Sequence, residues 1–271
     1  MSETTVEHFW DSLVVPYERW AEPTSTRLAT TALDLTTPSA GSSVLDVAAG
    51  TGALALTAAE RGHRVRAIDN SPGMVNRLTE RLSSYPGCSA EVMDATKLSY
   101  GDNEFDAAFS VLGVLFFGPE AATALTEMVR VVRPGGVIGV VNWARPVGGA
   151  PFFVPLARAI ERLDDPEVGT FQIPLISEYL ERSEVGDALR AAGCTDVRTE
   201  TVTADSPNPT PETFLTELHP FFQGFPQYRA AIDRHSSRFR ALVTEEADRM
   251  EMGDNGHPVA HVNIAYGRAP H

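Results

Sequence analysis

The stretch 43-SVLDVAAGTGALAL-56 places a β-branched apolar run directly before a glycine-rich turn and a helical pattern. The run 43–48 predicts a short buried strand, and the following residues predict a helix. Two glycines in the turn 50–52 let backbone amides and the helix N-terminus approach a ligand closely. With Ala55 the turn satisfies a loose dinucleotide-binding pattern, but Asp46 does not belong to that pattern. The stretch therefore predicts a ligand-binding turn and leaves the ligand open.

Composition and charge exclude several classes of function. The chain has 271 residues with 43% hydrophobic content, enough for a large core. A formal charge of −14 repels a phosphate backbone and an anionic membrane surface, so we expect neither nucleic acid nor membrane as a partner. Cys88 and Cys194 have no disulfide-framework or zinc spacing, which is typical of a reducing compartment. Without a basic, apolar leader at the N-terminus, a cytoplasmic location is expected.

Residues 44–145 alternate short β-branched runs with helical patterns, which predicts βαβ units and a parallel sheet. The expected strands are 43–48, 64–70, 89–95, 105–112 and 135–143. Helices are expected at 52–62, 71–84 and 120–132. Beyond 146, prolines and aromatic residues indicate a cap, interrupted by a helix and strand at 184–204 and followed by a last strand near 258–268. Seven strands in all are expected.

Three aspartates, Asp46, Asp69 and Asp94, end the first three expected strands. In an open parallel sheet the ligand crevice lies beyond the carboxyl ends of the strands, so all three should face it. A cationic amine, a ribose diol and an exocyclic amine are natural partners for three separated carboxylates. S-adenosylmethionine offers all three groups, whereas the pyrophosphate of NAD would be repelled by an acid beside the turn. A strand-terminal aspartate also commonly caps the next helix, and for Asp94 that alternative is open.

The same region resembles a known family. Its matching pieces are, in order, VLDVAAGTG, AIDNSPGM, VMDAT, NEFDAAFSVLGVLFF and EMVRVVRPGGVIGVVNWARP. In this order and spacing they resemble the class I S-adenosylmethionine-dependent methyltransferases, in particular the small-molecule subgroup similar to quinone-biosynthesis (methyltransferase type 11) enzymes. The resemblance implies a Rossmann-like fold, S-adenosylmethionine as cofactor, and a transferase activity on a small molecule.

The resemblance also implies a set of cofactor-binding residues. Asp46 and the backbone of 48–52 would hold the methionine end, and Asp69 would accept both ribose hydroxyls. The implied set is Tyr17, Asp46, Ala48, Ala49, Gly50, Thr51, Gly52, Asp69, Asn70, Met74, Asp94, Ala95, Ser110 and Val111.

The remaining members of that set have roles at the two ends of the cofactor. Asn70 and Met74 would flank the adenine, and Asp94 with Ala95 would meet its amine and ring. Ser110 and Val111 would offer carbonyl oxygen to the ammonium. Tyr17, in a helix that resembles the family's N-terminal lid, would close over the methionine carboxylate.

We therefore expect an α/β fold with a Rossmann-like, doubly wound, seven-stranded and mostly parallel sheet, helices on both faces and a helical cap. The expected organisation is an N-terminal helical lid (1–43), the cofactor-binding core (44–145), a cap insertion (146–182), a core continuation (183–204), a second cap insertion (205–258) and the last core strand with a tail (259–271).

Methyl transfer from a sulfonium needs chiefly a dry, aligned pocket. The segment FSVLGVLFF stands in the place of the Asp/Asn-Pro-Pro-aromatic motif that would resemble the DNA amino-methyltransferases. Metal-dependent transfer would need acidic residues near the ends of the fourth and fifth strands, and Ser110 and Asn142 do not supply them. We expect metal-independent transfer to O, N or C of a small apolar or aromatic metabolite, as in secondary metabolism. The aromatic residues considered for core or pocket are Phe116, Phe117, Phe152, Phe153, Phe171, Phe221, Phe222 and Phe225.

His219 is the candidate general base, because it lies among aromatic residues of the expected cap and a histidine titrates near neutral pH. A capping or packing role is the more common one for a histidine near a helix end. His235, His257 and His261 compete for the catalytic role.

Two other classes of function stay open. An NAD(P)-linked oxidoreductase would use the glycine turn and Asp69 but leave Asp46 and Asp94 without a role. A protein that binds the cofactor as a regulator, or that catalyses a non-methylating reaction, shares every motif quoted above. A monomer and a homodimer are both compatible with the sequence.

Overall fold

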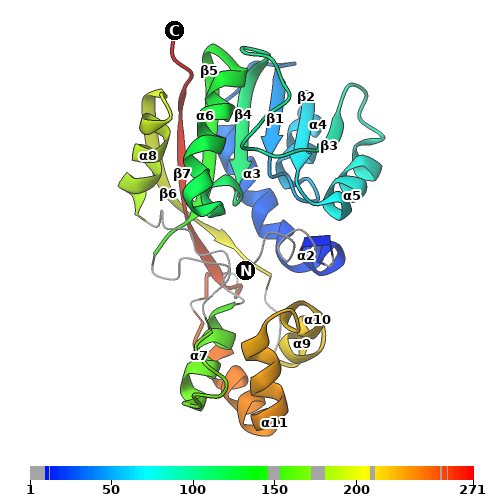
Figure 1. Ribbon diagram of the computed structural model, residues 1–271, viewed down its shortest axis with the longest axis vertical. Helices are drawn as coiled ribbons and strands as arrows, with labels where there is room; N and C mark the ends of the chain where they lie inside the picture. The colour runs from blue at the N-terminus through cyan, green and yellow to red at the C-terminus, as the bar shows by residue number, and fades with distance from the viewer. Residues whose placement is uncertain are drawn as a thin grey trace.

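The computed structural model describes residues 10–11, 13–145, 153–171, 181–207, 211–250, 252–254 and 256–271. Its centre is a seven-stranded sheet in the order β3-β2-β1-β4-β5-β7-β6 (Figure 1). The strands are β1 (Ser43–Val47), β2 (Arg64–Asp69), β3 (Ser89–Val92), β4 (Phe105–Val111), β5 (Val132–Trp143), β6 (Thr195–Asp205) and β7 (Val259–Arg268). β7 runs antiparallel to β5 and β6, and the remaining neighbours are parallel, which confirms the predicted fold class.

Helices cover both faces of this sheet, because its central strands are apolar on both sides. One face packs against α3 (Glu22–Thr36), α4 (Ala53–Glu60) and α5 (Pro72–Leu82). The other packs against α6 (Ala121–Val131) and α8 (Arg182–Ala191), with the short 3₁₀ turns η1 (Val114–Phe116) and η2 (Gly118–Glu120) between β4 and α6. α5 begins as the sequence predicts, since the hydroxyl of Ser71 accepts the Met74 N–H and Pro72 takes the first helical position.

The predicted lid at 1–43 divides into two parts in the structure. The apolar side of α3 is buried in the same core cluster as α4, through Leu28, Ala29, Ala32 and Leu33. α2 (Val14–Trp20) contains no fully buried residue and crosses the carboxyl edge of the sheet (Figure 1). α3 is therefore a layer of the core, and among the described residues of this segment only those before α3 have the position expected of a lid.

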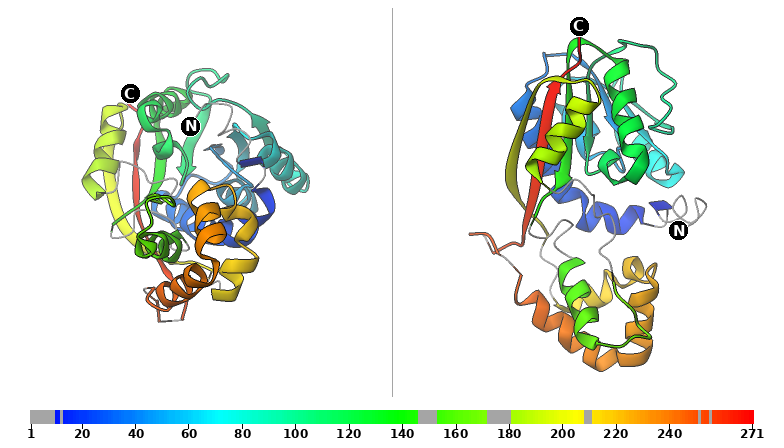
Figure 2. Two further views of the ribbon diagram at one scale, coloured as in Figure 1. Left: turned by 60° about the horizontal axis from the view of Figure 1, so that its bottom comes forward. Right: turned by 60° about the vertical axis from the view of Figure 1, so that its left-hand side comes forward.

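A helical lobe lies beyond the carboxyl edge of the sheet, with α2 between the two (Figures 1 and 2). It contains α7 (Val154–Leu163), α9 (Pro211–Thr216), α10 (His219–Phe222) and α11 (Pro226–Ala247). These helices come from both predicted cap insertions and share one apolar cluster. Its aromatic residues from the lobe are Phe153, Phe171, Phe222, Phe225, Tyr228 and Phe239, and Trp10 and Trp20 pack against it from the N-terminal segment.

The predicted aromatic set therefore divides between two places. Phe153, Phe171, Phe222 and Phe225 build the lobe, whereas Phe116 and Phe117 pack against the clusters of the sheet. Phe152 and the side chain of Phe221 lie outside the described residues. Among the helices that the structure describes, none is long and apolar enough to cross a membrane.

Candidate functional site

The turn between β1 and α4 is built on left-handed backbone. Ala48, Gly50 and Gly52 have φ angles of 57°, 56° and 106°. Glycine adopts this region without strain, and a Cβ at Gly52 would also overlap the Leu78 side chain. Ala48 adopts the same region with a side chain, which is uncommon for alanine. The turn is thereby held in one tight shape at the carboxyl edge of the sheet.

Asp46 lies in β1, one residue before the strand ends, with 1% of its surface exposed. Its Oδ2 accepts the backbone N–H of Ala55, in the first turn of α4, over 2.9 Å. Burial raises the pKa of Asp46 to about 7, against that hydrogen bond and with a smaller contribution from the Asp69 carboxylate. The side chain is thus a poorly solvated carboxylate that a cation would stabilise.

Asp69 ends the neighbouring strand β2 and faces the same turn. Its Oδ2 accepts the Gly50 N–H at 2.8 Å, and its Oδ1 accepts the Ser71 N–H at 2.9 Å. Burial raises the pKa of Asp69 although these backbone hydrogen bonds oppose the shift. Each carboxylate oxygen keeps a further lone pair with which to accept a hydroxyl.

Tyr17 in α2 covers the turn from outside. A Cβ at Gly50 would lie 3.4 Å from both the Cε1 and the hydroxyl oxygen of Tyr17, so the ring rests against the glycine backbone. Burial, with Glu22 and the two aspartates nearby, raises the pKa of the phenol. The phenol therefore stays protonated and can donate a hydrogen bond.

Ion pairs fix the N-terminal helices onto the turn and α5. Arg81 donates to the Thr51 carbonyl oxygen at 2.9 Å and to Glu22 at 2.8 Å, and Glu22 also accepts the Thr51 hydroxyl. Glu18 accepts from Arg77 at 2.7 Å. No sequence pattern predicts the role of these residues, because charges on three separate helices give no local spacing signal.

A second anchor joins the chain start to the N-terminus of α5. Asp11 accepts the Ser71 hydroxyl at 2.6 Å and the Gly73 N–H at 2.8 Å. Gly73 must be small here, since its Cβ would lie 3.0 Å from the backbone of Asp11. The anchor holds Asp11 against Ser71, which follows Asp69 by two residues, next to the predicted adenosine side of the site.

The end of β4 closes the site on its other side. Ser110 is buried, and its hydroxyl accepts the Val114 N–H at 3.0 Å. A Cβ at Gly113 would lie 2.6 Å from the Ser110 hydroxyl and 2.7 Å from the Ala48 Cβ. The structure therefore brings Ser110 and Val111 close to the turn after β1.

The remaining predicted residues follow β2 and β3 in the chain, and they differ in how far their side chains are exposed to solvent. Asp94 is exposed, and its Oδ1 accepts the Thr96 N–H at 2.8 Å and the Thr96 hydroxyl at 2.7 Å. That arrangement is a local cap, the alternative that the sequence left open. Met74 and Ala95 are buried, and Asn70 is exposed.

His219 lies in the helical lobe, away from the glycine turn in sequence and in packing. Its Nδ1 is 2.8 Å from the Tyr228 hydroxyl and its Nε2 is 2.7 Å from the Gln223 side-chain amide. Burial raises the pKa of Tyr228 to about 12. Since both ring nitrogens have partners, Tyr228 in α11 and Gln223 directly after α10, the geometry favours the packing role over the base.

Comparisons with known proteins agree with this architecture. A family model described as a methyltransferase domain matches residues 44–136. A demethylmenaquinone methyltransferase of Clavibacter sepedonicus is 33% identical over 184 residues, which cover 62% of this chain and 71% of that protein. An uncharacterized protein of Mycobacterium tuberculosis is 41% identical over 105 residues, and the match spans 38% of each chain.

A solved structure extends the likeness beyond the sequence match. A chain in the complex between the Haloferax volcanii Trm112 methyltransferase activator and the putative methyltransferase has a TM-score of 0.57, with 20% identity. The match covers 97% of this chain and 98% of that chain, including the region beyond 145. At that identity it supports the shared fold.

Proposed function

The chain belongs to the S-adenosylmethionine-dependent methyltransferases, and from that premise we propose that it transfers the methyl group of S-adenosylmethionine to O, N or C of a small apolar or aromatic metabolite without a metal ion. The site geometry supports this activity independently of the comparisons, because it matches the charge of the cofactor.

One observation supports the proposal above the others. In a dinucleotide-binding fold, the amides of the glycine turn and helix N-terminus face a pyrophosphate. Here two of these amides are occupied by carboxylates, the Gly50 N–H by Asp69 and the Ala55 N–H by Asp46. A pyrophosphate would therefore meet two negative charges, whereas a cationic methionine end and a ribose diol meet acceptors. This argues against the NAD(P)-linked alternative.

We assign the cofactor contacts by this chemistry. Asp46 and the backbone of 48–52 would hold the methionine end, and the outward lone pairs of Asp69 would accept the ribose hydroxyls. The protonated phenol of Tyr17 would donate to the methionine carboxylate. When bound, the cofactor supplies an electrophilic methyl group, and the protein aligns the acceptor and keeps water away.

The acceptor would lie between the carboxyl edge of the sheet and the helical lobe. Aromatic residues build the lobe core. The ring centroids of Phe153 and Phe225 are 6.0 Å apart and those of Phe171 and Phe225 are 5.5 Å apart, both edge to face. A lobe built on such an aromatic core suits a cover over an apolar ring system. The demethylmenaquinone methyltransferase relative makes a quinone-related acceptor the first class to test.

Ligand binding tests the cofactor assignment. We expect S-adenosylhomocysteine to raise the melting temperature and to bind with a measurable heat, while NADH at the same concentration does neither. A thermal shift with NADH and none with S-adenosylhomocysteine would overturn the proposal. Mass spectrometry of incubations with quinones, phenols, amines and polyketides then distinguishes a methylated product from a rearranged one.

His219→Ala tests the role of the lobe histidine. Since its ring nitrogens bond Tyr228 and Gln223, we expect a lower melting temperature and a single-turnover rate within about threefold of wild type, far from the hundredfold typical of a lost general base. Gln223→Ala serves as the matched control for the same hydrogen-bonded group. A rate loss near a hundredfold, with the ascending limb of the pH profile abolished, would identify His219 as the base.

A further inference from the structure

Strand β6 forms one outer edge of the sheet, beyond β7 (Figures 1 and 2). Its outward backbone groups can be identified from their partners. The Val197 carbonyl oxygen accepts from Arg190 at 3.4 Å, and the Asp205 carbonyl oxygen accepts from Arg27 at 3.0 Å. Because the ladder alternates, the odd-numbered residues between them also direct their N–H and C=O groups away from β7.

The middle of this edge has no hydrogen-bond partner in the part of the chain that the structure describes. Thr199, Thr201 and Thr203 are the residues whose backbone groups face outward there. A register shift between Thr195 and Arg198 ends the regular ladder at one side. At the other, the ion pair of Arg27 with Asp205 attaches α3. The open edge is therefore a short, regular strand, which is a template for pairing.

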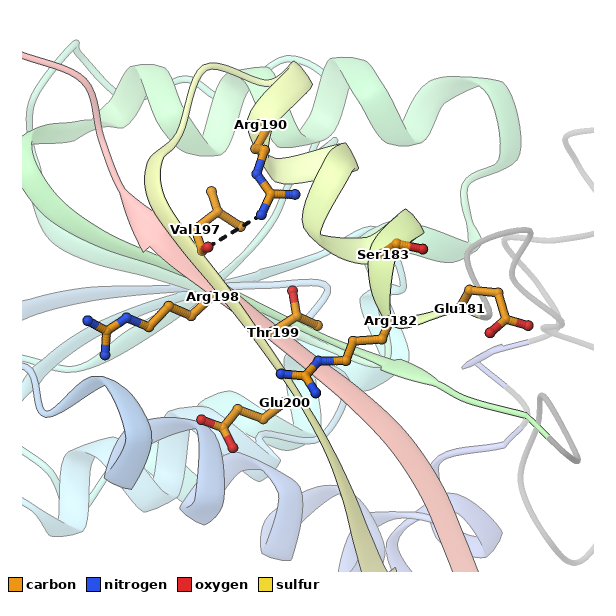
Figure 3. A pocket seen from close by; sticks show the side chains of 8 residues that line it. All are labelled: Glu181, Arg182, Ser183, Arg190, Val197, Arg198, Thr199 and Glu200. Carbon is orange, nitrogen blue, oxygen red and sulfur yellow. Dashed lines mark hydrogen bonds between the residues drawn. The ribbon is translucent and has the colours of Figure 1, made fainter.

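A groove of about 700 Å³ borders this edge (Figure 3). It carries both signs of charge, with three arginines and two glutamates among the eight residues that line it. Arg198 and Glu200 project from the same side of β6, as Figure 3 shows, and both are exposed. Within the described residues neither forms an ion pair, and Arg182 on the groove's other wall forms none either.

We propose that β6 is a dimer interface in which a second copy of this chain adds its own β6 antiparallel about Thr199. Such pairing places Arg198 opposite Glu200 of the second copy, and Glu200 opposite Arg198 of the second copy. Val197 then lies opposite Thr201 of the second copy, and Thr199 opposite its own counterpart. The outward backbone groups of Val197, Thr199 and Thr201 meet those of the second copy in this register, with the Val197 carbonyl oxygen accepting through the lone pair that Arg190 does not use. Arg198 and Glu200 therefore take the closer, non-hydrogen-bonded positions.

The charge pattern selects a second copy over another extended segment. A uniformly acidic segment would match Arg198 but meet Glu200, and a uniformly basic segment would match Glu200 but meet Arg198. An isologous contact pairs each charge with its opposite twice. Since a strand pair with its flanking groove makes a small interface, a dissociation constant on the order of micromolar is expected.

Sedimentation over a range of concentrations tests the interface. We expect wild-type protein to show a reversible monomer–dimer equilibrium. Arg198→Glu and Glu200→Arg should each weaken it by about tenfold or more, because two attractive pairs become like-charge pairs. Lys97→Glu, an exposed charge reversal beyond β3 at the opposite edge, should leave it unchanged. Thr199→Pro should also abolish pairing without loss of fold, since it removes an outward N–H.

Mixing the two single variants gives the sharpest result. A heterodimer of Arg198→Glu with Glu200→Arg restores both opposite-charge pairs, so the mixture should associate with wild-type affinity although each variant alone does not. The double variant R198E/E200R should likewise dimerise. A monomer at every concentration, a dimer insensitive to both reversals, or a mixture that fails to associate would overturn the proposal. None of these outcomes bears on methyl transfer.

Discussion

Replacing Asp69 by alanine is expected to weaken S-adenosylhomocysteine binding by about 10- to 150-fold, the equivalent of roughly 1.5–3 kcal/mol for a lost charge-assisted acceptor. Asp69 holds the Gly50 N–H and the Ser71 N–H and keeps lone pairs for the ribose hydroxyls. Its removal therefore loosens the turn and deletes the ribose acceptors together. Titration calorimetry with the purified variant measures the loss.

Asp69→Asn separates the two contributions. The amide keeps one oxygen for a backbone N–H but loses the second acceptor, so we expect a smaller loss of affinity and a melting temperature near that of wild type. Asp34→Ala, which removes an exposed partner of Arg61, is the control and should leave affinity unchanged. Wild-type affinity in Asp69→Ala would show that the ribose is not bound there.

The central layers of the fold follow from local sequence signals. Short runs rich in β-branched and apolar residues predict β1, β2 and β4, and the glycine turn and the Ser-Pro start predict the helices after the first two. The positions of Asp46 and Asp69 at one edge follow from parallel pairing alone. The position of α3 in the core does not, because Thr and Ser residues on its buried side weaken the apolar pattern.

Contacts between distant segments are the part that the sequence could not supply. The Arg81–Glu22 pair and the Asp11 anchor join residues that are far apart in the chain, and each is one of many possible charge pairings. The partners of His219 were hidden for the same reason, since Tyr228 reaches it only after α10 and α11 fold together. The sequence indicated His219 as a candidate base, whereas the partners of its ring nitrogens come from the packing of the lobe.

Asp46→Asn is expected to change stability and affinity in opposite directions. Burial raises the folded-state pKa of Asp46 to about 7, above its ordinary 3.8. A raised pKa means that the folded state favours the protonated carboxyl, so wild-type stability falls as pH rises from about 4 to about 7 and is level above. Asparagine removes this dependence. The gain in the free energy of unfolding from Asp46→Asn should be about 2.5 kcal/mol greater at pH 8 than at pH 5.

Urea unfolding of both proteins at the two pH values measures this difference, and any constant packing cost of the new amide cancels in it. Asp34→Asn, at an exposed position, should show no such pH-dependent gain. An Asp46→Asn gain that is equal at pH 5 and pH 8 would mean that the carboxyl titrates near its ordinary value in the folded protein.

The Asp46 carboxyl should also link cofactor binding to pH, because its ionised form is poorly solvated in the protein without a ligand. The ammonium of S-adenosylhomocysteine favours the ionised form of Asp46, so binding near pH 6.5 should release most of one proton, and affinity should rise by about fivefold between pH 6 and pH 7. In Asp46→Asn the affinity should fall and this proton release should disappear. Calorimetry in two buffers of different ionisation enthalpy counts the protons. Equal proton release in both proteins would assign the titration to another group and remove Asp46 from the methionine end of the site.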